Sequence, residues 1–260
     1  MNQIIRKPIL ITLAMMVLLL SCEVSERTET KSDDASSKTI EKESGQVETS
    51  TIEQRLKISD FIPRNSHSEA GFEQLAPKNK QLLSPGEVTF TFNTKKFPFV
   101  DGHSVRLAIE NGTEKFVFDA SKKITLPEGV FLCAAYLCDG NGVSIKNGKS
   151  YQLTQLNVGI DEKKNIDVKQ PMVFLNLPTS REGTVVLIDF MLFNTTLSKT
   201  GDKVRLSIDD QTEIYLDVWK PLKVEGLKTG KHKILIELIN ANGLLYDGIY
   251  ANDQFEFEVQ

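Results

Sequence analysis

Gly230-Lys-His-Lys-Ile-Leu-Ile-Glu-Leu-Ile-Asn-Ala-Asn-Gly243 is the stretch of sequence that decides the fold. It places an apolar run between a glycine and an Asn-Gly turn. Gly129-Val-Phe-Leu-Cys-Ala-Ala-Tyr-Leu-Cys-Asp-Gly-Asn-Gly142 has the same arrangement, at an offset of 101 residues. Apolar runs of this length, bounded by glycine and asparagine turns, are typical of β-strands. We therefore expect the chain to hold two copies of one β-module.

A second pair of segments supports a duplication. Val204-Arg-Leu-Ser-Ile208 repeats Val105-Arg-Leu-Ala-Ile109 at an offset of 99 residues, and both pairs occur in the same order. Matches at nearly constant offset are the signature of internal repeats. The alternative is that two unrelated β-modules share common strand patterns.

The rest of the chain also predicts short strands. Val88–Phe92 alternates apolar and polar residues, Val185–Phe193 is apolar enough for a central strand, and Pro171–Pro178 suits an edge strand. Because glycine, proline and asparagine turns separate such runs, we expect an all-β chain of two tandem immunoglobulin-like β-sandwiches, with a barrel as the alternative. Whether Ile52–Phe61 is a helix or a strand is left open.

The N-terminus has the pattern of a lipoprotein signal peptide. Arg6 and Lys7 precede an apolar run, Ile9–Leu20, that is shorter than the roughly 20 residues of a membrane span. The run ends in Leu19-Leu20-Ser21-Cys22, which resembles a bacterial lipobox. That resemblance implies cleavage before Cys22, lipidation of its sulfur and, with Glu23 following, transfer to an outer membrane. The alternative is an ordinary leader with a chance cysteine.

Composition predicts the domain organisation. Ser, Thr, Glu, Lys and Asp dominate from Glu23 to about Ser50, which predicts a disordered tether because too little apolar surface is available for a core. We expect four parts. They are a signal peptide (1–21), the lipidated Cys22 with its linker (22–51), a first sandwich (52–160) and a second sandwich (161–260).

Several segments resemble a family of bacterial envelope lipoproteins of uncharacterised function with two immunoglobulin-like domains. In the second half these are IDFMLFNTTLSKTGDKVRLSID, residues 188–209, and VEGLKTGKHKILIELINANG, residues 224–243. In the first half they are Ser84-Pro-Gly-Glu-Val-Thr-Phe-Thr-Phe and the strand that begins at Leu126-Pro-Glu-Gly. The resemblance implies two immunoglobulin-like domains and no established activity, since turn and core residues carry it.

Composition and motifs exclude several functions. The net charge of −4 argues against a nucleic-acid partner, which needs a basic surface. His67, His103 and His232 are widely spaced, whereas a zinc site needs three or four ligands. Asp209 and Asp210 are expected to form a turn. We therefore expect no metal, no cofactor and no catalytic residues, and a protein that is not an enzyme.

The two cysteines of the first module are not expected to form a disulfide. Cys133 and Cys138 lie about 16 Å apart along one strand and point to opposite faces, Cys133 inward and Cys138 outward. A reactive, exposed Cys138 is the alternative.

A binding face remains as a functional hypothesis. Trp219 and Tyr215 are expected to share the strand face opposite Leu216 and Val218, where aromatic rings bind sugars or proteins. Our first hypothesis is an envelope lipoprotein, anchored to the membrane through Cys22, that binds or scaffolds an unknown protein or glycan partner. The alternative is a carbohydrate- or peptide-binding module that uses this face or the interdomain cleft.

Overall fold

The structure is a computed structural model that describes residues 56–63, 67–100, 102–109, 112–116, 121–160, 166–176 and 185–259. Within these ranges the chain forms sixteen β-strands and no helix. Accordingly, none of the described residues belongs to a helix that could cross a bilayer. The predicted signal peptide, the Cys22 lipidation site and the tether lie outside the described residues.

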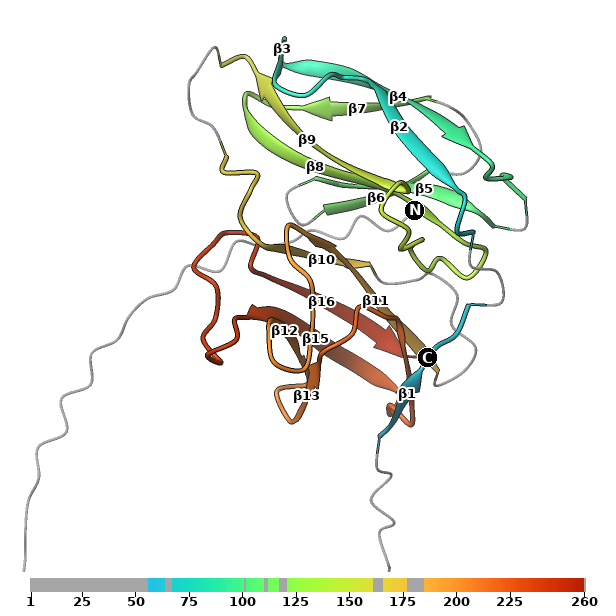
Figure 1. Ribbon diagram of the computed structural model, residues 1–260. Helices are drawn as coiled ribbons and strands as arrows, with labels where there is room; N and C mark the ends of the chain where they lie inside the picture. Colours follow the sequence, from blue (N-terminus) through green and yellow to red (C-terminus); the bar gives the residue numbers. More distant parts are fainter. Residues whose placement is uncertain are drawn as a thin grey trace, which may run out of the picture. The chain divides into compact units, whose positions relative to one another are not determined.

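The first sandwich consists of two sheets packed face to face (Figure 1). One sheet has the order β2 (Gly71–Ala76), β4 (Gly86–Lys95) and β7 (Ser121–Leu126). The other has the order β3 (Gln81–Leu83), β9 (Tyr151–Val158), β8 (Gly129–Cys138), β5 (Ser104–Ile109) and β6 (Gly112–Phe116). Inward side chains of both sheets, among them Phe90, Leu107 and Leu156, form one buried cluster. This burial of both inner faces stabilises the sandwich.

The second sandwich is built in the same way. One sheet has the order β1 (Lys57–Asp60), β14 (Leu222–Glu225), β11 (Val186–Phe193) and β10 (Met172–Asn176). The other has the order β13 (Thr212–Leu216), β12 (Lys203–Ile208), β15 (Gly230–Ile239) and β16 (Asn252–Val259). Ile188, Leu206 and Ile236 are fully buried between them. The apolar run 185–193 is a central strand and the proline-bracketed run 171–178 holds an edge strand, as predicted.

The two sandwiches share one strand order. Strands β2-β4-β7 correspond to β10-β11-β14, and β6-β5-β8-β9 correspond to β13-β12-β15-β16. This arrangement of seven strands in two sheets is that of immunoglobulin-like domains. The repeated sequences fall on equivalent strands, one pair on β5 and β12 and the other on β8 and β15. The chain is therefore all-β with two immunoglobulin-like sandwiches, which confirms the predicted fold class.

The loops that follow the two repeated strands also have the same hydrogen bonds. Gly142 N donates to Asp139 O at 2.9 Å, and Gly243 N donates to Asn240 O at 2.9 Å. Both glycines have a φ of 78°, which residues with a Cβ rarely adopt. The side-chain oxygen Oδ1 of Asp139 also accepts from the backbone N–H groups two and four residues later. Oδ1 of Asn240 does the same in the second loop. The offset of 101 residues therefore holds for backbone geometry as well as for sequence.

The N-terminal strand corrects the predicted domain assignment. Residues 52–160 were expected to form the first sandwich, but β1 pairs with β14 of the second, Lys57 opposite Glu225 and Asp60 opposite Leu222. Phe61 N continues this pairing by donating to Pro221 O at 3.0 Å. The open question about Ile52–Phe61 is thus answered for its described part, which contains a strand. A four-residue strand carries too little pattern to identify its partner.

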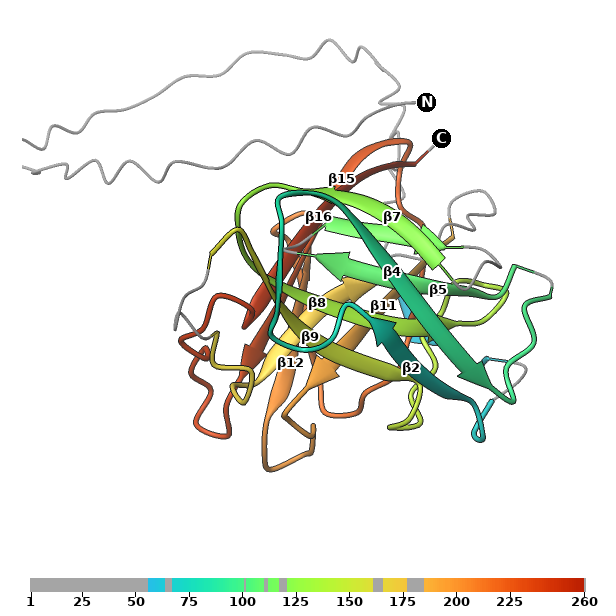
Figure 2. The same cartoon turned by 90° about the horizontal axis from the view of Figure 1, so that it is seen from above.

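The two sandwiches pack against each other through sheet faces. The outer face of β5, β8 and β9 lies on the outer face of β10 and β11, and side chains of both form a third buried cluster. Figure 1 shows the resulting succession of sheets, and Figure 2 shows it from above, with β4 and β8 lying over β11 and β12. This packing creates a joint in which functional side chains can be held rigidly.

Candidate functional site between the two sandwiches

The centre of the joint is apolar. Tyr136 and Leu132 of β8 and Phe174 of β10 are fully buried there. Cys138 belongs to this cluster, whereas Cys133 belongs to the core of the first sandwich, so the two cysteines point to opposite faces as predicted. Both are buried, and no disulfide joins them. Burial raises the pKa of Cys138 to about 12, which excludes the alternative of an exposed, reactive thiol.

Asp189 of β11 is the charged centre of the joint. Its carboxylate is fully buried and forms an ion pair with Lys146, which comes from the β8–β9 loop of the first sandwich. Oδ2 also accepts from Ser144 N at 2.7 Å and from Asn176 Nδ2 at 2.6 Å. A buried carboxylate needs such partners, because taking it out of water is costly. Asp189 therefore connects the first sandwich to the second through specific bonds.

Asn176 of β10 extends this network. Its Oδ1 accepts from Arg106 Nη1 and from the Tyr136 hydroxyl, which lies 3.3 Å away, and its Nδ2 also donates to Gly142 O at 3.0 Å. Burial raises the pKa of Tyr136 well above its usual value, so the hydroxyl keeps its proton. Side chains of both sandwiches thus share one hydrogen-bond network, which fixes the register of the joint.

The structure does not form the predicted aromatic face. Trp219 is half-buried beside the joint, where Nε1 donates to Phe190 O at 2.7 Å and the ring meets Tyr151 edge-on at 6.0 Å. Tyr215 projects from β13 and is 56% exposed. Strand β13 ends at Leu216, so the alternation that we extended to Trp219 stops three residues earlier. For the same reason Val218, expected to point inward, is exposed.

A cavity of about 370 Å³ lies beside Trp219. Its wall combines the loop Val143–Lys146 of the first sandwich with two segments of the second, Trp219–Pro221 and Asp60–Pro63 at the end of β1. Lys146 Nζ lies 5.5 Å from the centre of the Trp219 ring, a cation–π contact. One side of the indole is therefore occupied by the chain itself, which limits its use as a stacking platform for a sugar.

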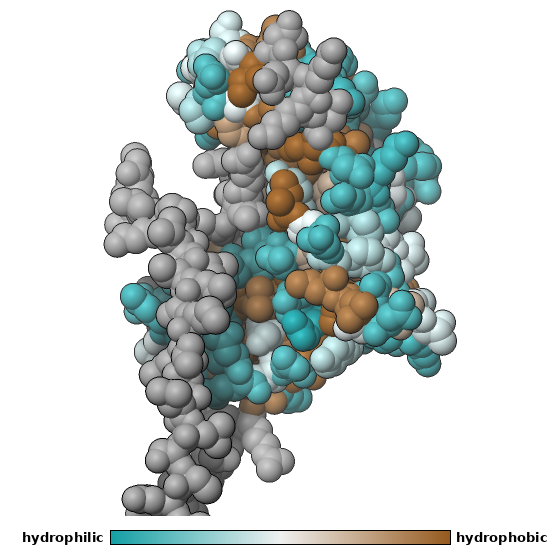
Figure 3. Space-filling view, turned by 90° about the vertical axis from the view of Figure 1, so that its left-hand side faces the viewer, coloured by the Kyte–Doolittle hydropathy of each residue, from teal (hydrophilic) through white to brown (hydrophobic). Residues whose placement is uncertain are grey.

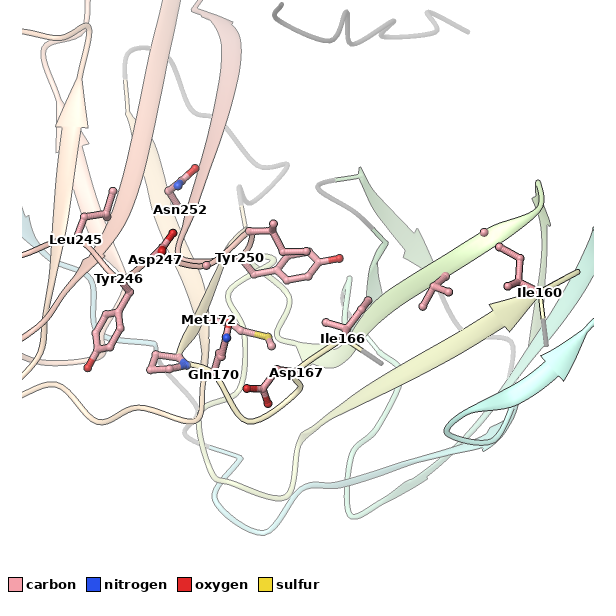
Figure 4. A pocket seen from close by; sticks show the side chains of 15 residues that line it. Ile160, Ile166, Asp167, Gln170, Met172, Leu245, Tyr246, Asp247, Tyr250 and Asn252 are labelled. Carbon is pink, nitrogen blue, oxygen red and sulfur yellow. The ribbon is translucent and has the colours of Figure 1, made fainter. Parts of the chain in front are cut away.

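A second cavity, of about 870 Å³, lies on the other side of the joint (Figure 4). It is bounded by the start of β8, the segment after β9 and the β15–β16 loop. Its polar lining includes Asp167, Gln170, Asp247 and Asn252, and its apolar lining includes Met172 and Ile249. The described lining residues contain two carboxylates and no basic side chain. This chemistry suits a ligand that donates hydrogen bonds and has an apolar part.

The β15–β16 loop carries exposed aliphatic side chains. Leu244, Leu245 and Ile249 are exposed, Ile249 by 74%. In the first sandwich, the positions of Leu244 and Leu245 are occupied by Val143 and Ser144, which are buried in the joint. Figure 3 shows the side of the molecule that carries this loop, where apolar patches lie among polar surface. The β8–β9 loop thus packs against the other sandwich, whereas the equivalent β15–β16 loop exposes its aliphatic side chains to an external partner.

The structure brings together two histidines that the sequence left apart. Nε2 of His67 and Nε2 of His103 are 3.0 Å apart. Burial and the nearby His103 lower the pKa of His67, and Asp139 partly opposes this. His232 lies elsewhere, bound to Asp209 Oδ2 and to Lys228 O, each at 2.7 Å. Among the residues that the structure describes, no three His, Cys, Asp or Glu side chains gather as a metal cluster.

Comparisons with known proteins identify no family. No protein-family model and no curated protein sequence matches the chain. Among solved structures, the fibronectin(III)-like modules of Clostridium thermocellum CbhA match at 15% identity over 73% of this chain and 94% of theirs, with a TM-score of 0.28. Bacteroides ovatus SGBP-B of a mixed-linkage glucan utilization locus, in complex with a heptasaccharide, matches at 9% identity over 71% and 69%, with a TM-score of 0.25.

Parabacteroides merdae β-glucuronidase matches at 9% identity over 73% of this chain and 24% of its own, with a TM-score of 0.22. These TM-scores are too low to support a functional comparison.

Proposed function

We propose that the chain is a lipid-anchored envelope protein whose two sandwiches bind or scaffold a partner without catalysing a reaction. The observation that carries this proposal is the joint. Asp189 and Asn176 are fully buried and are hydrogen-bonded to residues of the first sandwich. Two sandwiches held in one register present their loops in a fixed arrangement, which is what a scaffold or a binding unit requires.

The anchor is supported by the sequence Leu19-Leu20-Ser21-Cys22. A diacylglycerol and an added acyl chain give stable membrane attachment, where one chain alone gives a marginal one. The test is to express the wild type and Cys22→Ser in a bacterium fed an alkyne fatty acid. The wild type should carry the label and sediment with membranes, and Cys22→Ser should carry none. A labelled Cys22→Ser protein would overturn the anchor.

The partner surface is assigned to Leu244, Leu245 and Ile249, because exposed aliphatic side chains grouped on one loop mark interaction sites. A photo-crosslinking amino acid at position 249 should give a discrete adduct on intact cells. The same amino acid at Tyr215, which is also exposed but lies on β13, is the matched control. An adduct of the same size from both positions, or from neither, would contradict this assignment.

A second candidate function is the binding of a carbohydrate or peptide in the cavity of about 870 Å³. The favouring observation is its mixed lining, with amide and carboxylate groups of Gln170, Asn252 and Asp167 beside aliphatic side chains. A thermal-shift panel of glycans and peptides tests it, since a ligand at 100 times its Kd adds about 2.7 kcal/mol of stability. A hit that Asn252→Ala abolishes would favour this function over a protein partner, and a flat panel would exclude the ligands tested.

A further inference from the structure

His67 and His103 form an imidazole pair at one end of the first sandwich. Their ring centroids are 4.9 Å apart at an interplanar angle of 86°, and the two Nε2 atoms face each other at 3.0 Å. Phe97 packs edge-on against both rings, at 5.4 Å from His67 and 5.2 Å from His103. The two nitrogens are therefore held together beside an apolar ring.

The hydrogen bonds of the pair fix where its protons lie. His103 Nδ1 bonds to Val100 O. A carbonyl oxygen only accepts, so Nδ1 donates, and Nε2 of the neutral ring presents its lone pair to His67. The backbone at His67 is also held, because Asn147 Nδ2 donates to His67 O at 3.0 Å and to Ala70 O at 2.7 Å. The fold thus positions both rings in advance.

We propose that His67 and His103 bind one divalent transition-metal ion, of the class Cu²⁺, Zn²⁺ or Ni²⁺, through their Nε2 atoms. Imidazole nitrogen is a preferred ligand of these ions. With metal–nitrogen bonds of about 2.0–2.1 Å, two nitrogens bound at angles of about 90–109° lie about 2.8–3.4 Å apart. The observed separation of 3.0 Å falls in this range. Binding requires that the proton of His67 move from Nε2 to Nδ1, which frees the second lone pair. Both rings must also turn so that the two lone pairs point to an ion beside the line between the nitrogens.

The geometry points to an open site. The described residues supply two nitrogen ligands, and no third His, Cys, Asp or Glu side chain among them joins the pair. Water or an external ligand would therefore fill the other coordination positions of the ion. Asp139 acts on His67 through its charge, because its Oδ1 already accepts from Asn141 N and Val143 N at 2.9 Å each. The negative charge of Asp139, which acts to raise the pKa of His67, also favours a bound cation. His103 is anchored through its second nitrogen, as metal-bound histidines usually are.

Cu²⁺ and Zn²⁺ titrations of the full chain test the proposal. The protein is purified in detergent without an affinity tag and is dialysed against EDTA. One equivalent of CuCl₂ should bind and give an electron paramagnetic resonance spectrum with couplings to two imidazole nitrogens, and ZnCl₂ should raise the Tm. His67→Gln and His103→Gln should each weaken Cu²⁺ binding by more than about tenfold, since even the loss of an outer partner costs that much.

His232→Gln is the matched control, because both ring nitrogens of His232 bond to oxygen acceptors and neither presents a lone pair to a metal ion. It should bind Cu²⁺ as tightly as the wild type. The proposal is overturned if the wild type binds Cu²⁺ no more tightly than His67→Gln, or if His232→Gln abolishes binding. His103 is buried, so if His103→Gln fails to fold, the comparison of His67→Gln with the wild type decides the outcome.

Discussion

Lys146, in the β8–β9 loop, forms an ion pair with Asp189 of β11 and so joins the first sandwich to the second inside their interface. The Asp189 side chain is 0% exposed and that of Lys146 is 13% exposed. Removing one partner of a buried pair leaves an uncompensated charge, which costs about 3–5 kcal/mol. We therefore expect Lys146→Met to lower the free energy of unfolding by this amount in urea denaturation.

The double variant Lys146→Met with Asp189→Leu separates charge from packing. An apolar pair removes the uncompensated charge, but Asp189→Leu also takes the acceptor away from Ser144 N and Asn176 Nδ2. The double variant should therefore recover only part of the stability lost by Lys146→Met. Glu87→Gln is the control, since it disrupts the exposed Lys123–Glu87 pair and should cost less than about 1 kcal/mol. Equal losses from Lys146→Met and Glu87→Gln would contradict a structural role for the joint pair.

Trp219 is expected to stabilise the fold. Trp219→Phe leaves Phe190 O without its donor, which costs about 1–3 kcal/mol. Tyr215→Ala, at an exposed position of β13, should change the free energy of unfolding by less than about 0.5 kcal/mol. Thermal and urea unfolding measure both. A Trp219→Phe protein as stable as the wild type would revive Trp219 as a residue kept for ligand binding.

Local patterns were sufficient to predict the two sandwiches. The alternation and turn residues of Val105–Ile109 and Gly230–Gly243 are properties of neighbours in sequence, and both segments are strands of the expected type. The pairing of β1 with β14 is different, because it joins segments far apart in the chain through four residues with little pattern of their own. The pairing of His67 with His103 depends equally on tertiary structure.

One signal in the sequence was missed. Asp189 interrupts the apolar run Val185–Phe193, which we interpreted only as a central strand. A carboxylate inside such a strand must be buried, and a buried carboxylate needs a cationic or hydrogen-bonding partner. The run therefore predicted a polar contact across this sheet face. The identity of its partner, Lys146, could not be predicted, because it depends on how the two sandwiches pack.

The cysteine thiols should be unreactive in the folded protein. Burial raises the pKa of Cys138 to about 12, so its thiolate is scarce at pH 8, and Cys133 is buried in the other core. We expect iodoacetamide to label neither residue in native buffer and both residues in 6 M urea, as read by peptide mass spectrometry. Labelling of Cys138 without unfolding would show that the joint opens in solution.

His232 should make stability depend on pH near neutrality. Burial opposes its protonation, but the hydrogen bonds to Asp209 and to Lys228 O and the charge of Asp209 together raise its pKa above 6.5. The folded state therefore binds this proton more tightly than the unfolded state. The resulting stabilisation is fully present below about pH 6.5 and is lost as the pH rises through the raised pKa. Urea midpoints of the wild type should fall over this range.

His232→Asn isolates the effect, because it removes the titrating group. The difference in the free energy of unfolding between the wild type and His232→Asn should be largest at pH 5.5 and should shrink as the pH rises to 8.5. Asp209→Asn should produce the same loss of pH dependence, since Asp209 supplies both a hydrogen bond and a charge to the imidazolium. A difference that grows with pH would mean that burial outweighs Asp209 and that His232 is neutral in the folded state.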